Sequence, residues 1–176
     1  YIFTYFISTG FMLLFKIMSE VNSHKFNWDI CGHEKIVHFL ESAILGGQVA
    51  QAYLFSGPSH LGKQAVAQAF ISSLLCQGDK IARPCHLCFN CLQIKNNIHP
   101  DFYTVKREIS DKTEKLSQGI LIDQIRDLKA KLQQSTMLAG GYKVALITEA
   151  HLMNINTANA LLKILEEPTS KTIIIL

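Results

Sequence analysis

The chain has 176 residues, of which 48% are hydrophobic and 18% are charged, and its formal net charge is +3. This length is enough for one α/β domain with a hydrophobic core, and so small a net charge gives no argument for nucleic acid binding. Five cysteines, of which four gather between positions 76 and 91, do not fit the spread pairs of a small disulfide-bonded secreted protein. They favour reduced thiols that hold a metal in a cytoplasmic protein.

The first seventeen residues are mostly apolar and aromatic. Their uncharged run ends at Lys16, short of the ~20 residues that a membrane-spanning helix needs. They also lack the basic start and the small-residue cleavage site of a signal peptide. Since the chain begins with Tyr and Met18 follows, we expect residues 1–17 to be a non-native or upstream extension and residues 18–176 to be the domain itself. We expect no membrane partner.

Helices and strands alternate in the first half of the chain. Cys31, beside Ile30, is expected to be a small buried thiol. Apolar residues at helical spacing predict a helix over Glu34–Leu45, which Gly46-Gly47 ends. A short apolar run predicts a buried strand over Ala52–Phe55, and a second helix follows over Lys63–Leu75. Residues 78–97 show little regular pattern.

The second half continues the alternation, with strands over Phe102–Val105, Lys143–Ile147 and Ile173–Leu176, and helices over Ile122–Leu132 and Asn156–Glu166. A polar stretch at 107–119 predicts a loop or hairpin, and Gly140-Gly141 predicts a turn. Asn154 or Asn156 should cap the last helix and Pro168 should stop it. The pattern predicts an α/β fold with a parallel sheet flanked by helices. Because the chain stops within a strand, we expect a fragment, truncated after the fourth strand.

The segment Gly57-Pro-Ser-His-Leu-Gly-Lys-Gln64 is similar to the phosphate loop of P-loop NTPases. Such a loop binds phosphates with backbone N–H groups and a lysine, and its Ser or Thr binds Mg²⁺. Gly57, Gly62 and Lys63 match this pattern, and the strand-loop-helix context is right. Gln64 replaces the hydroxyl residue, and an amide is a poorer Mg²⁺ ligand. The loop therefore leaves ATP binding open.

The end of the third predicted strand carries a second departure. Motor ATPases place Asp-Glu there, the Asp for the metal and the Glu to orient the attacking water. This chain has Thr148-Glu149. Gln64 and Thr148 stand at the two positions that supply metal ligands in a motor ATPase, and neither residue is a suitable ligand. We therefore expect neither Mg²⁺ binding nor ATP hydrolysis by the chain itself. Glu149 is at least as compatible with a structural role, capping or pairing nearby, as with a catalytic one.

Cys85-x-x-Cys88-x-x-Cys91 supplies three thiolates in a short span, and Cys76 can complete a tetrahedral set. We predict a closed, structural Zn²⁺ site. An iron–sulfur cluster is the main rival, but the ferredoxin run needs a fourth Cys shortly after the third, followed by Pro. His86 lies inside the motif and is an alternative ligand. With four cysteines present, we expect it to be a spectator.

The order of motifs resembles the bacterial clamp-loader ATPase family of the AAA+ class over about residues 28–176. The motifs are Trp28-Asp-Ile-x-Gly-His, the phosphate loop, the four cysteines, His99-Pro-Asp, Ile122-Asp-Gln-Ile-Arg126, Gly141-Tyr-Lys-Val and Met153-Asn-x-x-x-Ala-Asn-Ala-Leu-Leu-Lys-x-Leu-Glu-Glu-Pro168. The last string is highly specific. It argues against the outside alternative, a zinc-ribbon binding module fused to a degenerate nucleotide fold.

The resemblance implies a hetero-pentamer with gamma/tau and delta subunits that opens a ring-shaped sliding clamp and places it on primed DNA. Within this family the rival interpretation is a gamma/tau motor subunit, which carries intact Lys-Thr and Asp-Glu pairs. Gln64 and Thr148 depart from that pattern. They favour a subunit that does not hydrolyse ATP itself. For such a subunit the resemblance implies a rigid stator that works through protein contacts in a DNA polymerase III holoenzyme.

Overall fold

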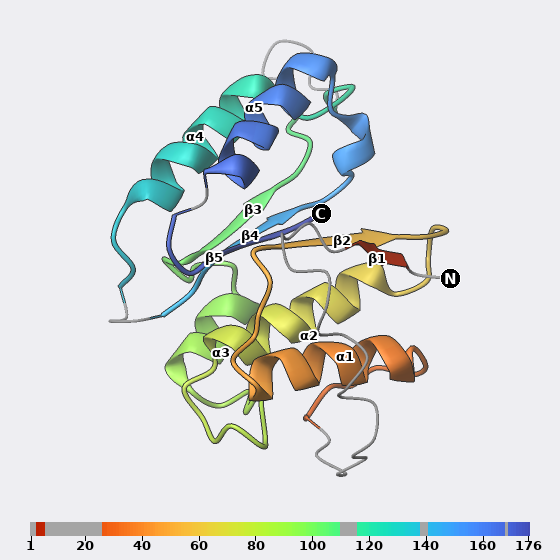
Figure 1. Cartoon of the computed structure of the whole chain (residues 1–176), viewed down its shortest axis with the longest axis vertical. Helices are drawn as coiled ribbons and strands as arrows, with labels where there is room; N and C mark the ends of the chain where they lie inside the picture. The colour runs from red at the N-terminus through yellow and green to blue at the C-terminus, as the bar shows by residue number, and fades with distance from the viewer. Residues whose placement is uncertain (1–2, 6–25, 110–115, 138–140, 168) are drawn as a thin grey trace. The chain divides into compact units, whose positions relative to one another are not determined.

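The computed structural model describes residues 3–5, 26–109, 116–137, 141–167 and 169–176 (Figure 1). They form two compact units, residues 1–50 with 55–97 and residues 51–54 with 98–176. Of the extension expected at residues 1–17, only Phe3–Tyr5 is described, as strand β1. Met18, Gly140 and Pro168 lie outside the described residues. In the described part of the chain, no helix has the length and apolarity to cross a membrane.

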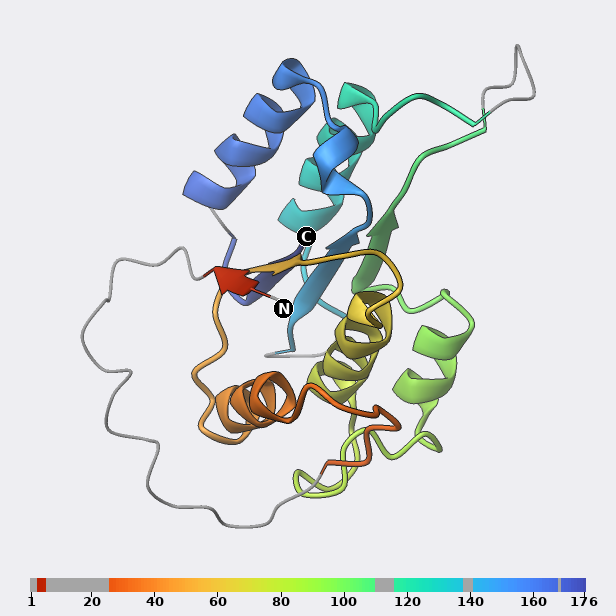
Figure 2. The same cartoon turned by 90° about the vertical axis from the view of Figure 1, so that its right-hand side faces the viewer.

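The first unit contains the helices α1 (Glu34–Leu45), α2 (Lys63–Leu75) and α3 (Phe89–Lys95). Helix α2 contacts both α1 and α3, and its position between them is visible in Figure 2. More than half of α2 is buried, namely Val66, Ala67, Phe70, Ile71, Ser73, Leu74 and Leu75. Burying one large apolar side chain contributes roughly 1.5–3 kcal/mol, so the buried side chains of α2 contribute substantially to the stability of this unit.

Helix α1 spans the predicted residues and ends at the predicted glycines. The N–H of Gly47 donates to Ile44 O at 3.2 Å, and that of Gln48 donates to Ala43 O at 3.0 Å. Gly47 has a φ of 65°, the left-handed conformation that this type of helix end requires. The two glycines therefore stop α1 by satisfying its last carbonyls.

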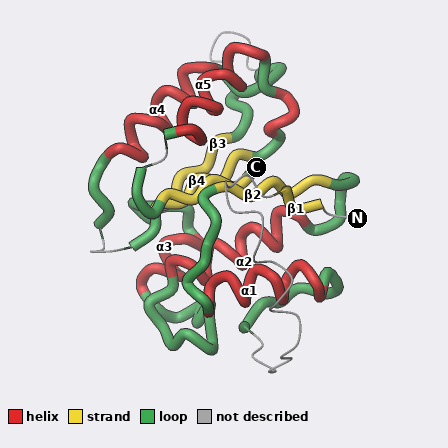
Figure 3. The backbone as a smooth tube through the Cα atoms, in the orientation of Figure 1, coloured by secondary structure: helices red, strands yellow, loops and turns green. Residues whose placement is uncertain are grey.

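The second unit holds parallel strands in the order β2-β5-β4-β3, drawn in yellow in Figure 3. They are β2 (Ala52–Ser56), β3 (Phe102–Val105), β4 (Lys143–Ile147) and β5 (Thr172–Ile175). The unit boundary crosses β2 after Leu54. All five residues of β4 are buried, as expected for the centre of a parallel sheet. This confirms the predicted α/β class.

Helices α4 (Ile122–Gln133) and α5 (Ile155–Glu166) lie side by side and share a core with the sheet. That core contains Val105, Ile120, Ile125, Leu128, Leu132, Ala145, Ile147, Leu161, Ile164 and Ile174. Of the two predicted caps, Asn154 is the one used: its Oδ1 accepts the N–H of Thr157 at 2.8 Å. A 3-10 turn, η1 (Ala150–Leu152), precedes it.

Three features differ from or sharpen the sequence analysis. Helix α3 lies where little regular pattern was expected. In the polar stretch at 107–119, Ile109 and Leu116 form an antiparallel bridge, which is the pairing expected for a hairpin. The expectation that Cys31 is buried is wrong: the residue is exposed, in the segment that leads to the left-handed His33 before α1.

Candidate functional site

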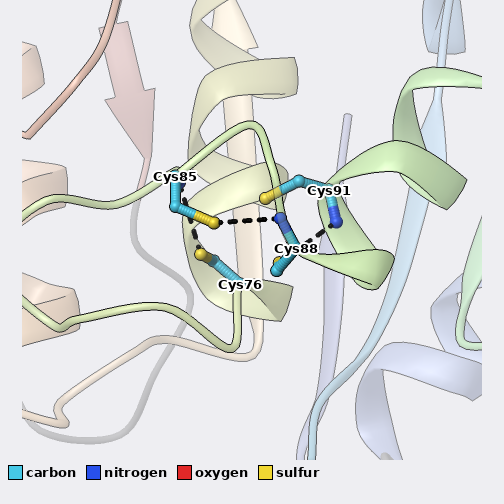
Figure 4. A group of neighbouring side chains, drawn as sticks. All are labelled: Cys76, Cys85, Cys88 and Cys91. Carbon is cyan, nitrogen blue, oxygen red and sulfur yellow. Dashed lines mark hydrogen bonds between the residues drawn. The ribbon is translucent and has the colours of Figure 1, made fainter.

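The four clustered cysteines come from the two ends of one irregular loop in the first unit. Cys76 is the C-cap of α2, Cys85 lies in the loop, and Cys88 and Cys91 stand at the start of α3. Their Sγ atoms all lie within 4.8 Å of one another, and Figure 4 shows the side chains turned toward a common centre. The predicted grouping of these cysteines is therefore present in the fold.

The spacing fits a tetrahedral ion. Four sulfurs at the usual Zn–S distance of about 2.3 Å are separated by about 3.8 Å, which is compatible with this cluster. Backbone N–H groups already point at the sulfurs: those of Gly78 and Cys85 donate to Cys76 Sγ at 3.2 and 3.4 Å, and that of Cys88 donates to Cys85 Sγ at 3.3 Å. Such donors stabilise thiolates, the form that binds metal. The cluster could thus hold a metal ion.

The thiols differ in acidity. Backbone hydrogen bonds from Leu87 and Cys88 lower the pKa of the Cys85 thiol to about 6. Burial raises the pKa of Cys76 and Cys91 above the ordinary value for a thiol. The lowered pKa favours the thiolate form of Cys85 near neutral pH, whereas burial disfavours the thiolate form of Cys76 and Cys91.

The backbone of Gly78 lies directly against the cluster, and its N–H donates to Cys76 Sγ at 3.2 Å. A Cβ atom added to it would meet Cys85 Cβ at 2.9 Å, Cys85 Sγ at 3.1 Å and Cys76 Sγ at 3.3 Å. These distances are too short for a side chain unless the cysteines move. Gly78 is thus a requirement of the site that the spacing of the cysteines does not indicate.

The phosphate-like loop belongs to the same unit and has the expected local geometry. Gly62 is the N-cap of α2 with a φ of 75°. Lys63 Nζ donates to the carbonyls of Gly57 and Pro58, both at 2.7 Å. His60, which stands where such loops often have another glycine, has a φ of 64°. Its left-handed backbone explains why glycine suits that position. Gln64 is exposed in the first turn of α2.

One contact to this loop was missed by the sequence analysis. His33 Nε2 lies 2.9 Å from the carbonyl oxygen of Leu61, so an imidazole from the residue before α1 touches the loop. The Gly-His dipeptide was noted only as part of a motif. Nothing in its spacing indicates a contact with residue 61, because the two residues are far apart in the sequence.

Thr148 and Glu149 belong to the second unit, directly after β4. Thr148 Oγ1 donates to Val105 O at 3.4 Å. The carboxylate of Glu149 is paired with Arg107: Nε lies 2.8 Å from Oε2, and Nη2 lies 2.8 Å from Oε1. This pairing lowers the pKa of Glu149 and raises that of Arg107. The sequence left Glu149 a catalytic role or a structural one, as a cap or as an ion-pair partner. In the structure it is the ion-pair partner of Arg107.

A polar groove lies between α4 and α5, with a volume of about 550 Å³. It is lined by Ile122, Ile125, Arg126, Lys129, Asn154, Asn156, Asn159, Ala160 and Lys163. Three cations line it, and Arg126 also contacts Asp123 at 2.9 Å. These cations form no basic run in the sequence because they come from two helices. The only available signal was the three-residue spacing of Arg126 and Lys129, which places both on one helix face.

Residues 32–176 match the protein family described as "DNA polymerase III, delta subunit". The chain is 42% identical over 134 residues to DNA polymerase III subunit delta' of Pseudomonas aeruginosa, which covers 75% of the chain and 39% of that relative. It is 34% identical over 148 residues to the tau subunit of Bacillus subtilis, and 32% identical over 140 residues to that of Escherichia coli. These matches cover 84% and 80% of the chain, but only 24% and 20% of the tau subunits.

Proposed function

Since the chain belongs to the DNA polymerase III delta subunit family, we propose that it acts as the delta-prime-type stator of a bacterial clamp loader. In this role it serves the ATP-dependent loading of a sliding clamp without hydrolysing ATP itself. The family match over residues 32–176, and the higher identity to the delta' relative than to the two tau relatives, support this choice. The chain is then an accessory subunit of a nucleotidyltransferase holoenzyme in the cytoplasm.

One observation carries the non-hydrolysing role. At the end of β4, where a motor subunit needs a metal-binding Asp and a water-orienting Glu, Thr148 bonds to a backbone carbonyl and Glu149 is held by Arg107 at two points. Glu149 has a partner for each oxygen, and Thr148 supplies no carboxylate. With Gln64 in the first turn of α2, both positions that would bind Mg²⁺ lack the appropriate ligand.

The phosphate loop retains part of its chemistry. Lys63 and the N-terminus of α2 remain, and both favour an anion. We therefore assign to Gly57, Gly62 and Lys63 a nucleotide-binding shape without turnover. ATP bound there would have a structural effect only.

The four cysteines are assigned to structural Zn²⁺. When bound, the ion supplies a rigid cross-link, and four sulfurs leave no open position for a substrate. Cys76, Cys85, Cys88 and Cys91 would hold it, while His86 contacts Asn27 O at 3.3 Å and serves as no ligand.

The partners proposed are gamma/tau and delta subunits in a hetero-pentamer, and through the complex the sliding clamp and primed DNA. The groove between α4 and α5 supports proximity to DNA, because Arg126, Lys129 and Lys163 can contact phosphates while the asparagines donate hydrogen bonds. The alternative, a gamma/tau-type motor, is favoured by the retained Gly57, Gly62 and Lys63 and by the similarity to tau subunits.

The test is a reconstituted loader made from the full-length protein, motor subunits, delta, clamp and primed DNA. DNA-stimulated ATP hydrolysis is measured with the wild type, with this subunit omitted, and with Lys63→Ala. Lys80→Ala, which changes an exposed lysine of the same unit, is the matched control. We expect omission to abolish turnover and both lysine variants to retain it.

A loss of turnover with Lys63→Ala as deep as with omission would show a working ATP site and support the motor interpretation. If omission itself leaves turnover and clamp loading intact, the stator role is wrong.

A further inference from the structure

The segment Phe26–Trp28, which precedes α1, is fastened to both long helices of the first unit. The N–H of Phe26 donates to Glu41 Oε1 in α1 at 3.0 Å. Trp28 Nε1 donates to Ser73 Oγ in α2 at 2.7 Å, and the Trp28 ring packs edge-on against Phe70 with centroids 6.5 Å apart. Ser73 and Phe70 are fully buried. The segment therefore docks by specific contacts on both of these helices.

The residue between these two anchors is held by the cysteine loop. The N–H of Asn27 donates to Arg83 O at 2.9 Å, and Asn27 O lies 3.3 Å from Nε2 of His86. Arg83 and His86 lie on either side of Cys85, one of the four cluster cysteines. His86 reaches this position with a left-handed backbone, at a φ of 57°. The contacts thus depend on the path that the loop takes around the cluster.

We propose that the four-cysteine module is a clasp for the segment Phe26–Trp28, so that metal occupancy of the cluster and docking of Trp28 on α2 are coupled. The proposal goes beyond the stator role and does not depend on it. It requires only that the cluster binds a metal, which is measured separately in the test.

The coupling follows from what holds the loop. Residues 77–87 contain neither helix nor strand, so the contacts that hold their path are the hydrogen bonds to the cysteine sulfurs, those from the Arg83 guanidinium to Gly78 O at 3.4 Å, and the ligands of a bound ion. Without an ion the loop gains conformational entropy, and both contacts to Asn27 weaken. With an ion, Arg83 and His86 present their oxygen and nitrogen at fixed positions.

Coupling between two sites is reciprocal. If the metal favours the docked segment, the docked segment must favour the metal by the same factor. Trp28→Phe keeps the aromatic ring but removes the Nε1 donor to Ser73. We expect it to weaken metal binding roughly five-fold or more, the lower end of a measurable coupling.

The experiment uses the whole chain, in which Trp28 is the only tryptophan. The emission maximum of Trp28 and its quenching by acrylamide are recorded with Zn²⁺ at one equivalent and after chelation, while far-ultraviolet circular dichroism reports the helices. The key variant is His86→Asn, because Asn tolerates a left-handed backbone but lacks the imidazole. His151→Asn, at an exposed histidine of the second unit, is the control.

We expect chelation to shift Trp28 emission to longer wavelength and to increase its quenching while most of the helical content is retained. His86→Asn should increase quenching with one Zn²⁺ still bound, and His151→Asn should not. Unchanged Trp28 emission after metal loss would overturn the proposal. So would a metal-loaded His86→Asn protein with wild-type quenching, a result that stays informative even if chelation unfolds the unit.

Discussion

Arg107 and Glu149 form an ion pair at two points, although they are 42 positions apart in the chain. Both N–O distances are 2.8 Å, so the planar guanidinium matches the carboxylate as a fork. Glu149 has a left-handed backbone with a φ of 57° and is the N-cap of η1, but its side chain does not cap that turn. Glu149, which we propose to correspond to the water-orienting Glu of motor ATPases, takes part in a surface contact between the ends of β3 and β4.

The ion pair predicts the titration of Glu149. Its folded-state pKa is lowered, so the pair stabilises the fold above the unfolded-state pKa of a Glu, and this contribution is lost as pH falls through the folded-state pKa. In Arg107→Gln, the pKa of Glu149 measured by NMR titration should rise toward the ordinary value for a glutamate. Arg126→Gln, which breaks the exposed pair with Asp123, should leave it unchanged. Because the groups are exposed, salt should weaken the effect; a salt-independent shift would contradict this account.

The cluster predicts metal stoichiometry. Cys88→Ser should reduce bound zinc from one equivalent to well below one, because a hydroxyl is a poor replacement for a thiolate ligand. Cys31→Ser, at the exposed cysteine outside the cluster, should retain one equivalent. Metal analysis after gel filtration measures both.

Removing the metal should unfold the loop from Cys76 to Cys91 and leave the thermal transition of the sheet. Loss of the whole transition would mean that the module is not an appended element.

The space around Gly78 predicts a strong effect from one methyl group. In Gly78→Ala the new Cβ would lie too close to Cys85 and Cys76, so the sulfurs must separate and zinc affinity should fall at least about ten-fold. Gln77→Ala changes the adjacent exposed residue and should bind zinc normally. Competition with a chromophoric chelator gives both affinities. Equal affinities would show that the loop can move Gly78 away from the cluster at little cost.

The thiol acidities predict the order of alkylation in the metal-free protein. Backbone donors lower the pKa of Cys85 to about 6, so its iodoacetamide rate should rise through that pH and level off near neutrality. Cys76 and Cys91 are buried and their pKa values are raised, so they should react only at alkaline pH. Peptide mapping by mass spectrometry separates the sites. Alkylation of Cys91 before Cys85 at pH 7 would contradict the assigned environments.

Lys143 predicts a stability effect in the second unit. It is 5% exposed, and its Nζ donates to the carbonyls of Leu132 and Gln134 at the end of α4. A cation there also suits the helix dipole. Lys143→Met should cost about 1–3 kcal/mol in urea unfolding, since Gln134 O loses the lysine donor, and Leu132 O loses it too but keeps the donor from Thr169 Oγ1. Lys131→Met, at an exposed position in the last turn of α4, should change stability by about 0.5 kcal/mol or less.

Helices with a full apolar period and strands with a continuous apolar run were predictable from the sequence, and one short helix was not. The bounds of α1, α2, β3 and β4 are those expected, because their apolar spacing and terminal residues agree. Helix α3 was missed for two reasons. It has only seven residues, too few for a period to show, and its N-cap is Cys88, whose Sγ accepts the N–H of Cys91. Cysteine is not among the usual capping residues.

Part of the candidate site could also be predicted from the sequence, and part could not. Two-residue gaps between Cys85, Cys88 and Cys91 indicate a metal because the ligands are close in the sequence. The ion pair of Arg107 with Glu149 and the contact of His33 with Leu61 depend on segments that only the tertiary fold brings together. Such contacts leave no spacing pattern in a single sequence.

The two ends of helix α2 carry residues of two different sites. Lys63, at its start, donates to carbonyls of the phosphate-like loop, and Cys76, which caps its end, belongs to the cysteine cluster. Each residue added to a helix turns everything beyond it by about 100° and moves it by 1.5 Å. An insertion within α2 would therefore rotate Cys76 out of the cluster or Lys63 out of its loop. We therefore expect insertions and deletions within this thirteen-residue helix to disrupt one of the two sites. The irregular loop that follows can accommodate changes in length.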